Sequence, residues 1–273
     1  MSYKKIFYSL LLTGWGVIPC ISFAQVKAYN PDTTARKTND TTQVVEILPG
    51  NKSLELRRVD DSTTLQILTG NVQLRQGKTL FFCDSCVINN RTRIFEAFGH
   101  VHINDSDTSN AWSDYLQYLS DKKIAYLKGN VKLSSGTGIL TTPDLEYDVD
   151  TKIGIYIHGG KVVNNNKTVL TSKEGYYYTD LKDVYFKQNV VLDDPAYKLK
   201  TDSLLYNTEN ETARFIAYTF IKDSTGRTIE TTEGFYDLKS GQATFGNHPR
   251  IRDGKLFVTG EQVNSNDSTG MIF

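Results

Sequence analysis

The sequence predicts an all-β protein assembled from copies of a two-strand repeat of about 30 residues. Three observations lead to this fold class. A glycine column and a tyrosine column both recur in steps of 29 or 30 residues, and apolar and polar residues alternate between them. Alternation with a period of two is typical of half-buried strands, and a fixed period of this length is typical of stacked repeats. The glycine column consists of Gly70, Gly99, Gly129, Gly159, Gln188, Ala217 and Gly246, and the tyrosine column of Tyr118, Tyr147, Tyr177, Tyr206 and Tyr236.

The first strand of each copy ends on the tyrosine column. A small Ser or Thr stands five residues before the tyrosine, an acid three or four before it, and usually a leucine two before it. Gly175 and Gly234 replace that leucine in two later copies. We interpret the acids as residues that stabilise a turn or bulge. They are Asp84, Asp114, Asp144, Glu174, Asp202 and Glu233.

A polar turn follows each tyrosine and leads into the second strand. Ser120-Asp121-Lys122 and Asp237-Leu238-Lys239-Ser240 are examples rich in the residues that favour turns. The strand after the turn places Ala125, Leu127 and Val131 on one face. It ends on the phrase Gly-Asn-Val, which recurs with small changes. Neither strand can bury its apolar face alone, so neighbouring copies must stack.

About seven copies fill residues 44–273, and the last copy is cut short at Met271-Ile272-Phe273. We expect this apolar final strand to pair with another protein or with further chain. Residues 25–43 are polar and aperiodic and are predicted to be a disordered lead. Residues 1–24 have the layout of a cleaved secretory signal: Lys4 and Lys5, an apolar run, then Ser22-Phe23-Ala24. A retained anchor and lipidation at Cys20 are the alternatives.

Cys83 and Cys86 would remain after cleavage. Their spacing suggests a redox or metal site, but a zinc site needs two further ligands and none is evident. Cys83 occupies the Ser/Thr column and Cys86 the leucine column, so we expect both to pack as small apolar residues. Residues three apart on a regular strand point to opposite faces, which argues against a disulfide between them.

The repeated phrases resemble the OstA/LptA family, in particular the OstA-like proteins of Bacteroidetes-type bacteria. Ser113-Asp114-Tyr115-Leu116-Gln117-Tyr118, a turn, and then Gly129-Asn130-Val131 match the family repeat. The phrase Thr201-Asp202-Ser203-Leu204-Leu205-Tyr206 matches the family repeat again. The resemblance as a whole covers residues 44–273. The resemblance implies an elongated, open β-jellyroll. It implies a periplasmic protein that binds lipopolysaccharide and bridges its transport to the outer membrane. It also implies jellyroll domains of the inner- and outer-membrane components as partners, and end-to-end self-association.

Stacked apolar strand faces would form a long hydrophobic interior, which would hold acyl chains if its walls splay and would be only a core if they close. Burying each methylene contributes roughly 0.8 kcal/mol. The candidate groove residues are Val72, Leu74, Phe95, Ala97, Val101, Ile103, Leu116, Ala125, Leu127, Val131, Leu133, Leu145, Ile155, Ile157, Val184, Phe186, Val190, Leu204, Phe215 and Ala217. The tyrosine column could line this groove, but we favour an outer aromatic ladder for it.

Charge and motifs argue against several other functions. The formal net charge is zero, and acids and bases are interspersed, which does not favour nucleic acid as a partner. No nucleotide-binding motif is present, no cofactor or metal is implied, and the acids recur as the repeat requires, so we expect no enzyme. His100 and His102 share a strand but lack an evident third ligand. A β-repeat scaffold or adhesin that binds no lipid is the alternative function. The N-terminal jellyroll of a longer outer-membrane translocon is another.

Overall fold

The structure is a computed structural model that describes residues 45–76, 78–105, 109–135, 138–164, 168–178, 181–195, 197–207, 210, 212–237, 239–266 and 271–272. These residues form 23 strands and no helix, and every pairing given below is antiparallel. Within these ranges no helix is long and apolar enough to cross a membrane. The predicted signal and lead lie outside the described residues. The all-β prediction is confirmed.

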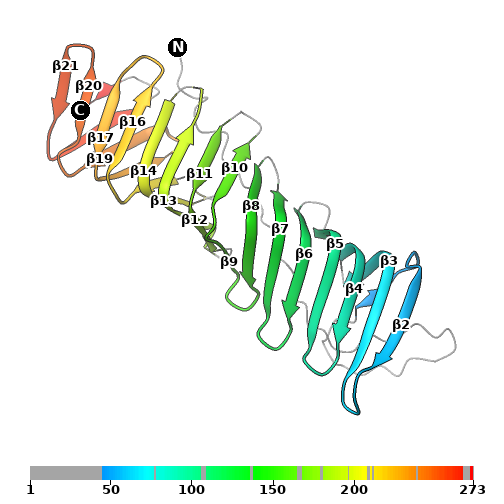
Figure 1. The fold of residues 1–273 in the computed structure, drawn as a ribbon. Helices are drawn as coiled ribbons and strands as arrows, with labels where there is room; N and C mark the ends of the chain where they lie inside the picture. Colours follow the sequence, from blue (N-terminus) through cyan, green and yellow to red (C-terminus); the bar gives the residue numbers. More distant parts are fainter. Residues whose placement is uncertain are drawn as a thin grey trace. The chain divides into compact units, whose positions relative to one another are not determined.

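The chain divides into two compact units. The N-terminal unit comprises residues 45–133 and Pro143–Lys152, and the C-terminal unit comprises Ser134–Thr142 and residues 153–272. The strands that begin in the first unit are β1 (Glu46–Ile47), β2 (Ser53–Arg58), β3 (Thr64–Gln76), β4 (Thr79–Asn89), β5 (Ile94–Asp105), β6 (Ser109–Leu119) and β7 (Ile124–Ser135). Strand β8 (Gly138–Asp148) contributes its second half to this unit (Figure 1). Strands β3 to β6 pair in sequence order, as a stack of two-strand repeats requires.

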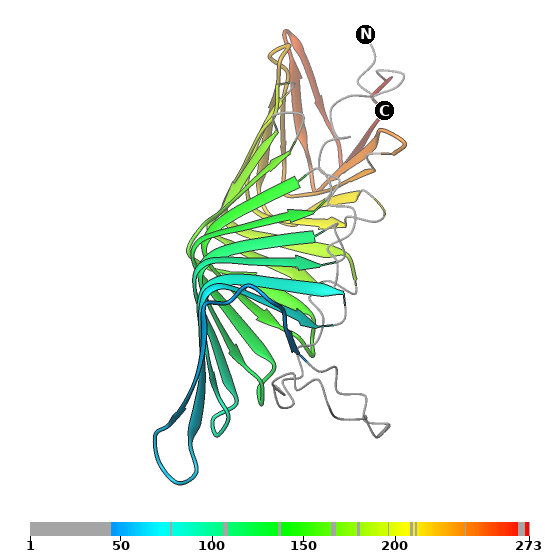
Figure 2. The same ribbon diagram turned by 90° about the vertical axis from the view of Figure 1, so that its right-hand side faces the viewer.

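Each long strand of the N-terminal unit turns sharply near its middle, as Figure 2 shows for the cyan and green strands. The bend coincides with a bulge, since Thr69 pairs with Ser85 and Val72 with Cys83. Gly70 and Asn71 therefore lie opposite the single residue Asp84. The bend divides each strand in two. We call the halves that carry the tyrosine column and its partners the tyrosine wall, and the other halves the opposite wall.

The bulge explains why the phrase Gly-Asn recurs. Gly129 and Asn130 have φ angles of 74° and 48°, both in the left-handed region that glycine and asparagine tolerate best. A Cβ on Gly129 would stand 2.5 Å from Oδ2 of Asp114. The Asn130 side chain donates a hydrogen bond of 2.8 Å to the same carboxylate oxygen. In this copy the acid therefore holds the bulge of the neighbouring strand, as interpreted from the sequence.

Where Asp or Asn directly follows the tyrosine column or its equivalent Ile88, the turn is an Asx turn. In one copy Oδ1 of Asp148 accepts hydrogen bonds from the backbone N–H groups of Asp150 and Thr151, both at 2.9 Å. Asn89 makes the equivalent pair of bonds in the N-terminal unit. Lys152 leaves the turn with a φ of 54°. A short side-chain acceptor at this position therefore closes the hairpin in these copies. Leu119 and Tyr178 occupy the same position in two other copies.

The C-terminal unit contains more and shorter strands, because several strands break at the bend. They are β9 (Ile153–Tyr156), β10 (Gly160–Asn164), β11 (Val169–Ser172), β12 (Glu174–Tyr178), β13 (Asp183–Asp193), β14 (Tyr197–Asn207), β15 (Thr212–Phe215), β16 (Thr219–Asp223), β17 (Thr228–Thr231), β18 (Glu233–Asp237), β19 (Gln242–Gly246), β20 (Arg250–Asp253), β21 (Leu256–Thr259), β22 (Gln262–Asn266) and β23 (Met271–Ile272).

The pairings sort these strands into the same two walls. The tyrosine wall runs β9, β12, β13, β14, β15, β18, β19, β22 and β23. The opposite wall runs β8, β10, β11, β13, β14, β16, β17, β20 and β21. Strands β13 and β14 continue through the bend and join both walls. The two-strand repeat therefore persists to the end of the unit.

The glycines that replace leucine are matched by large neighbours. A Cβ on Gly175 would lie 2.3 Å from the ring of Tyr156, and one on Gly160 would lie 2.4 Å from it. Tyr156 thus fills the space that two missing side chains leave, and its hydroxyl hydrogen-bonds Oγ of Ser172 at 2.7 Å. Burial raises the pKa of Tyr156 to about 12, so the phenol is neutral. Dense packing is kept although the repeat changes.

Candidate functional site

The apolar interior between the two walls is the candidate functional site. In the N-terminal unit both walls turn predicted residues inward, and those residues are buried. They are Val72, Leu74, Phe95, Ala97, Val101, Ile103, Leu116, Ala125, Leu127, Val131, Leu133 and Leu145. In the C-terminal unit the same holds for Val184, Phe186, Val190, Leu204 and Phe215. Each unit therefore has a continuous apolar lining that comes from both of its walls.

Three predicted residues do not face the interior. Ile157 is 46% exposed, and Ile155 and Ala217 are only half-buried. On β9 the inward positions belong to Gly154 and Tyr156, so Ile155 lies on the outer face. The chain between β15 and β16 leaves strand conformation at the bend, which removes Ala217 from the inward alternation. The prediction that these three residues line the interior was wrong. Where a strand breaks at the bend, the alternation of inward and outward positions does not continue across the break.

The tyrosine column faces inward, so the predicted outer ladder is wrong. Tyr118, Tyr147, Tyr177, Tyr206 and Tyr236 are all buried. Each stands two residues after the leucine column, and residues two apart on a strand share a face. That spacing was the signal that could have placed the tyrosines in the lining. The actual outer aromatic contacts come from other residues, such as the stack of His102 on Trp112 with 5.0 Å between ring centroids.

The opposite wall supplies lining residues that the sequence reasoning did not select. They belong to the apolar column seven residues before the tyrosine, and Phe81, Leu140, Leu170 and Leu199 are buried members of it. The column was visible in the sequence. The odd spacing of seven residues would place this column and the tyrosine on opposite faces of a straight strand. Because the bend lies between them, both face the interior.

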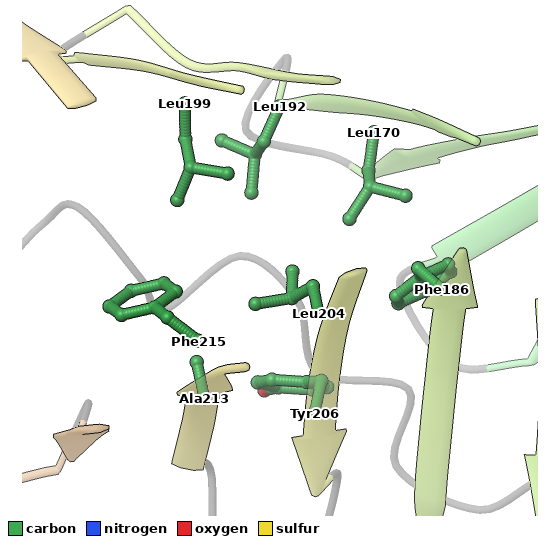
Figure 3. A pocket seen from close by; sticks show the side chains of 8 residues that line it. All are labelled: Leu170, Phe186, Leu192, Leu199, Leu204, Tyr206, Ala213 and Phe215. Atoms are coloured by element: carbon green, nitrogen blue, oxygen red, sulfur yellow. The ribbon is translucent and has the colours of Figure 1, made fainter. Parts of the chain in front are cut away.

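Side chains from both walls fill the interior of the C-terminal unit between β11 and β15. Figure 3 shows Leu170, Leu192 and Leu199 from the opposite wall pointing toward the tyrosine wall. Phe186, Leu204, Tyr206, Ala213 and Phe215 line the other side. The cavity between them is about 10 Å³, close to the smallest space that admits one water. An acyl chain can enter this part of the interior only if the two walls move apart.

The two cysteines lie in the lining of the N-terminal unit. Cys83 and Cys86 are both buried, although Asp84 between them is exposed and Ser85 is half-buried. The expectation that they point to opposite faces was wrong, because the bend of β4 falls between them. The interaction between the Cys83 and Cys86 thiols, a hydrogen bond, raises the pKa of Cys86 together with burial. The same bond lowers the pKa of Cys83.

The histidines make separate contacts rather than a shared site. Nδ1 of His100 lies 2.8 Å from Oδ2 of Asp84, and Nε2 of His102 lies 2.8 Å from Oδ1 of Asn110. Among the described residues no group of three His, Cys, Asp or Glu side chains could hold a metal ion.

A second hollow of about 340 Å³ lies in the C-terminal unit, beside the bend. Arg214, Glu233, Phe235 and Gln262 line it. Its opposed charges favour neither an anion nor a cation, so its chemistry selects no ligand class.

Comparison with known proteins places the chain in a family. A family model described as "OstA-like protein" matches residues 43–202, which is more than half of the chain. Among solved structures the chain is similar to LptH of Pseudomonas aeruginosa, described as the LptA homologous periplasmic component of the lipopolysaccharide transport device. That similarity has a TM-score of 0.35 at 12% identity and covers 38% of this chain and 79% of LptH. No curated protein matches the chain. The chain therefore belongs to the family of OstA-like proteins.

Proposed function

We propose that this protein is a periplasmic, non-enzymatic carrier of lipopolysaccharide. It binds the acyl chains of lipopolysaccharide between its two walls and bridges the transport of lipopolysaccharide to the outer membrane. The observation that carries the proposal is the continuous apolar lining of each unit, in a chain of the OstA-like family. The name of LptH, a periplasmic transport component, agrees with this role.

The chemistry of the lining suits a fatty tail. Each methylene that leaves water contributes roughly 0.8 kcal/mol, so contact with the apolar lining favours the bound acyl chain. A lining that repeats once per copy offers similar contacts at each register. A lipid could therefore move along it without large barriers, and directed movement would need an external energy source.

Wall separation must occur on the side away from the bend, because β13 and β14 link the walls covalently at the bend. The contacts that oppose separation are apolar, as those of Leu192 and Leu199 with the tyrosine wall are. Such contacts are non-directional, and a bound acyl chain replaces them with contacts of the same kind. Opening therefore costs less once lipid is present.

The proposed partners are lipopolysaccharide, the jellyroll domains of the inner- and outer-membrane transport components, and further copies of this chain. The end strands agree with strand-to-strand docking. In the N-terminal unit β2 pairs with β3, and it carries Leu54 and Leu56 exposed. In the C-terminal unit β21 pairs with β20 and exposes Leu256 and Phe257. Exposed apolar strands at an edge are available for pairing.

Photo-crosslinking tests the proposal. A photoreactive residue at Leu127 or at Phe186 places the probe inside the N-terminal or the C-terminal unit. The matched controls are Lys128 and Lys187, the next residues along each strand, which lie on the outer face. We expect lipopolysaccharide adducts from the two inward positions and none from the two controls. Adducts at no inward position, with the probes inserted and the chain folded, would overturn the carrier.

The tight packing in Figure 3 favours one alternative, a β-repeat scaffold that binds no lipid. In that case the interior is only a core. The scaffold predicts that lipopolysaccharide leaves the amide exchange of the lining strands unchanged. The carrier predicts that exchange changes in the lining strands.

A further inference from the structure

The cysteine pair of the N-terminal unit lies at an unusual point of the fold. Cys83 is 6% exposed and belongs to the opposite wall, where it pairs with Val72. Cys86 is 0% exposed and belongs to the tyrosine wall, where it pairs with Leu68. The pair therefore spans the bend, with one thiol on each wall.

The bend brings the two side chains together. On a straight strand residues three apart diverge, but the bend at Asp84 and Ser85 turns both cysteines toward the interior. Inward side chains on the two sides of a corner converge on its concave side. Both cysteines are free thiols in this structure, so the two sulfurs are available to react with each other. Equivalent positions in the next copy hold Ser113 and Leu116, which are also both buried.

We propose that Cys83 and Cys86 form an intramolecular disulfide that links the two walls across the bend of β4. Both thiols lose their hydrogens and one sulfur–sulfur bond forms. The two electrons and two protons pass to a disulfide oxidant, either a protein disulfide or oxidised glutathione, which is reduced to two thiols. The reaction occurs during folding, before the neighbouring strands bury the thiols. It does not depend on lipid binding.

Peptide mass spectrometry tests the disulfide directly. Trypsin cuts after Lys78 and Arg91, so both cysteines fall in one peptide of residues 79–91, which excludes Cys20. The full chain is unfolded in urea, refolded in a glutathione redox buffer, treated with an alkylating agent in denaturant, and digested. We expect the peptide to be unalkylated and lighter by about 2 Da than its fully reduced form. Two alkylated thiols, a glutathione adduct or a disulfide between chains would overturn the proposal.

Three variants separate geometry from chance oxidation. Cys83→Ser with Cys86→Leu copies the neighbouring repeat and must show no disulfide. Adding Ser113→Cys and Leu116→Cys to that background moves the pair to the same bend of β6, where we expect the disulfide to form again. Adding Ala125→Cys and Lys128→Cys instead places the pair on a straight part of β7, facing opposite sides. Equal oxidation of the bend pair and the straight pair would show that the bend is irrelevant.

Discussion

Single residues set the conformation of each bend. Gly129 has a φ of 74°, and a Cβ at this position would contact Asp114. Both the backbone conformation and the lack of space for a side chain therefore favour glycine. Gln188 and Asn189 show that larger residues can occupy the bulge at φ angles of 60° and 55°. In that copy the side chain of Gln188 donates a hydrogen bond of 2.5 Å to Glu174, which is the role that Asn130 has toward Asp114.

Gly129→Ala should destabilise the protein by about 1–3 kcal/mol, because alanine at positive φ is strained and its Cβ would press on Asp114. Urea unfolding measures the change. Gly246→Ala is the matched control from the same column, since no positive φ occurs there and its Cβ would meet Glu233 only at 3.6 Å. The control should change stability by about 0.5 kcal/mol or less. Equal losses in the two variants would contradict this account of the bulge.

His100 occupies the asparagine position of its bulge and should titrate above its ordinary pKa of about 6.5. The hydrogen bond and the charge of Asp84 raise its pKa. Because the folded state favours protonated His100, this contact contributes stability at pH values below the ordinary pKa. The contribution is lost as pH rises through the raised pKa. An NMR titration should show the pKa of His100 fall in Asp84→Asn, and an unchanged pKa would disprove the contact.

At the scale of the element, Asx turns close the hairpins of four copies. Asp148, Asn89, Asn207 and Asp237 all use a side-chain oxygen to accept backbone N–H groups of the turn. These residues lie directly after the tyrosine column, with one exception. Asn89 follows Ile88, the buried residue that stands in the column's place in β4. The turn therefore sets the register of both strands in the copy.

Asp148→Ala should cost about 1 kcal/mol, since it leaves the N–H groups of Asp150 and Thr151 without their side-chain acceptor. Asp148→Asn keeps the acceptor and copies Asn89, so it should retain most of the stability. Thermal unfolding of the two variants beside the parent chain measures the difference. If asparagine costs as much as alanine, the charge rather than the hydrogen bonds stabilises this turn.

At the scale of the whole molecule, stability is distributed along stacked copies. Each copy contributes one position to each column of the lining and depends on its neighbours to bury it. Leu127, at 0% exposure, is an inner member of the N-terminal unit. A defect there should weaken the copies beside it more than distant copies.

Leu127→Ala should destabilise the N-terminal unit by about 2–5 kcal/mol, because it leaves a cavity in place of a fully buried side chain. Hydrogen exchange read by mass spectrometry should rise most in β5, β6 and β7 and less in β3. Lys128→Ala, on the outer face of the same strand, is the control and should leave exchange nearly unchanged. A uniform rise along the unit would indicate a single cooperative core instead of stacked copies.

The sequence by itself determined the all-β class, the length of the repeat, the position of the turns and most of the lining. These follow from local chemistry: alternation, Asx turns and the left-handed preference of Gly-Asn. Only the tertiary structure decided whether a side chain near a bend points into the interior or outward. An extra residue in a bulge reverses the alternation, and the sequence does not say which strand bends or breaks. For that reason the inward positions of both cysteines and the outward positions of Ile155, Ile157 and Ala217 could be assigned only from the tertiary structure.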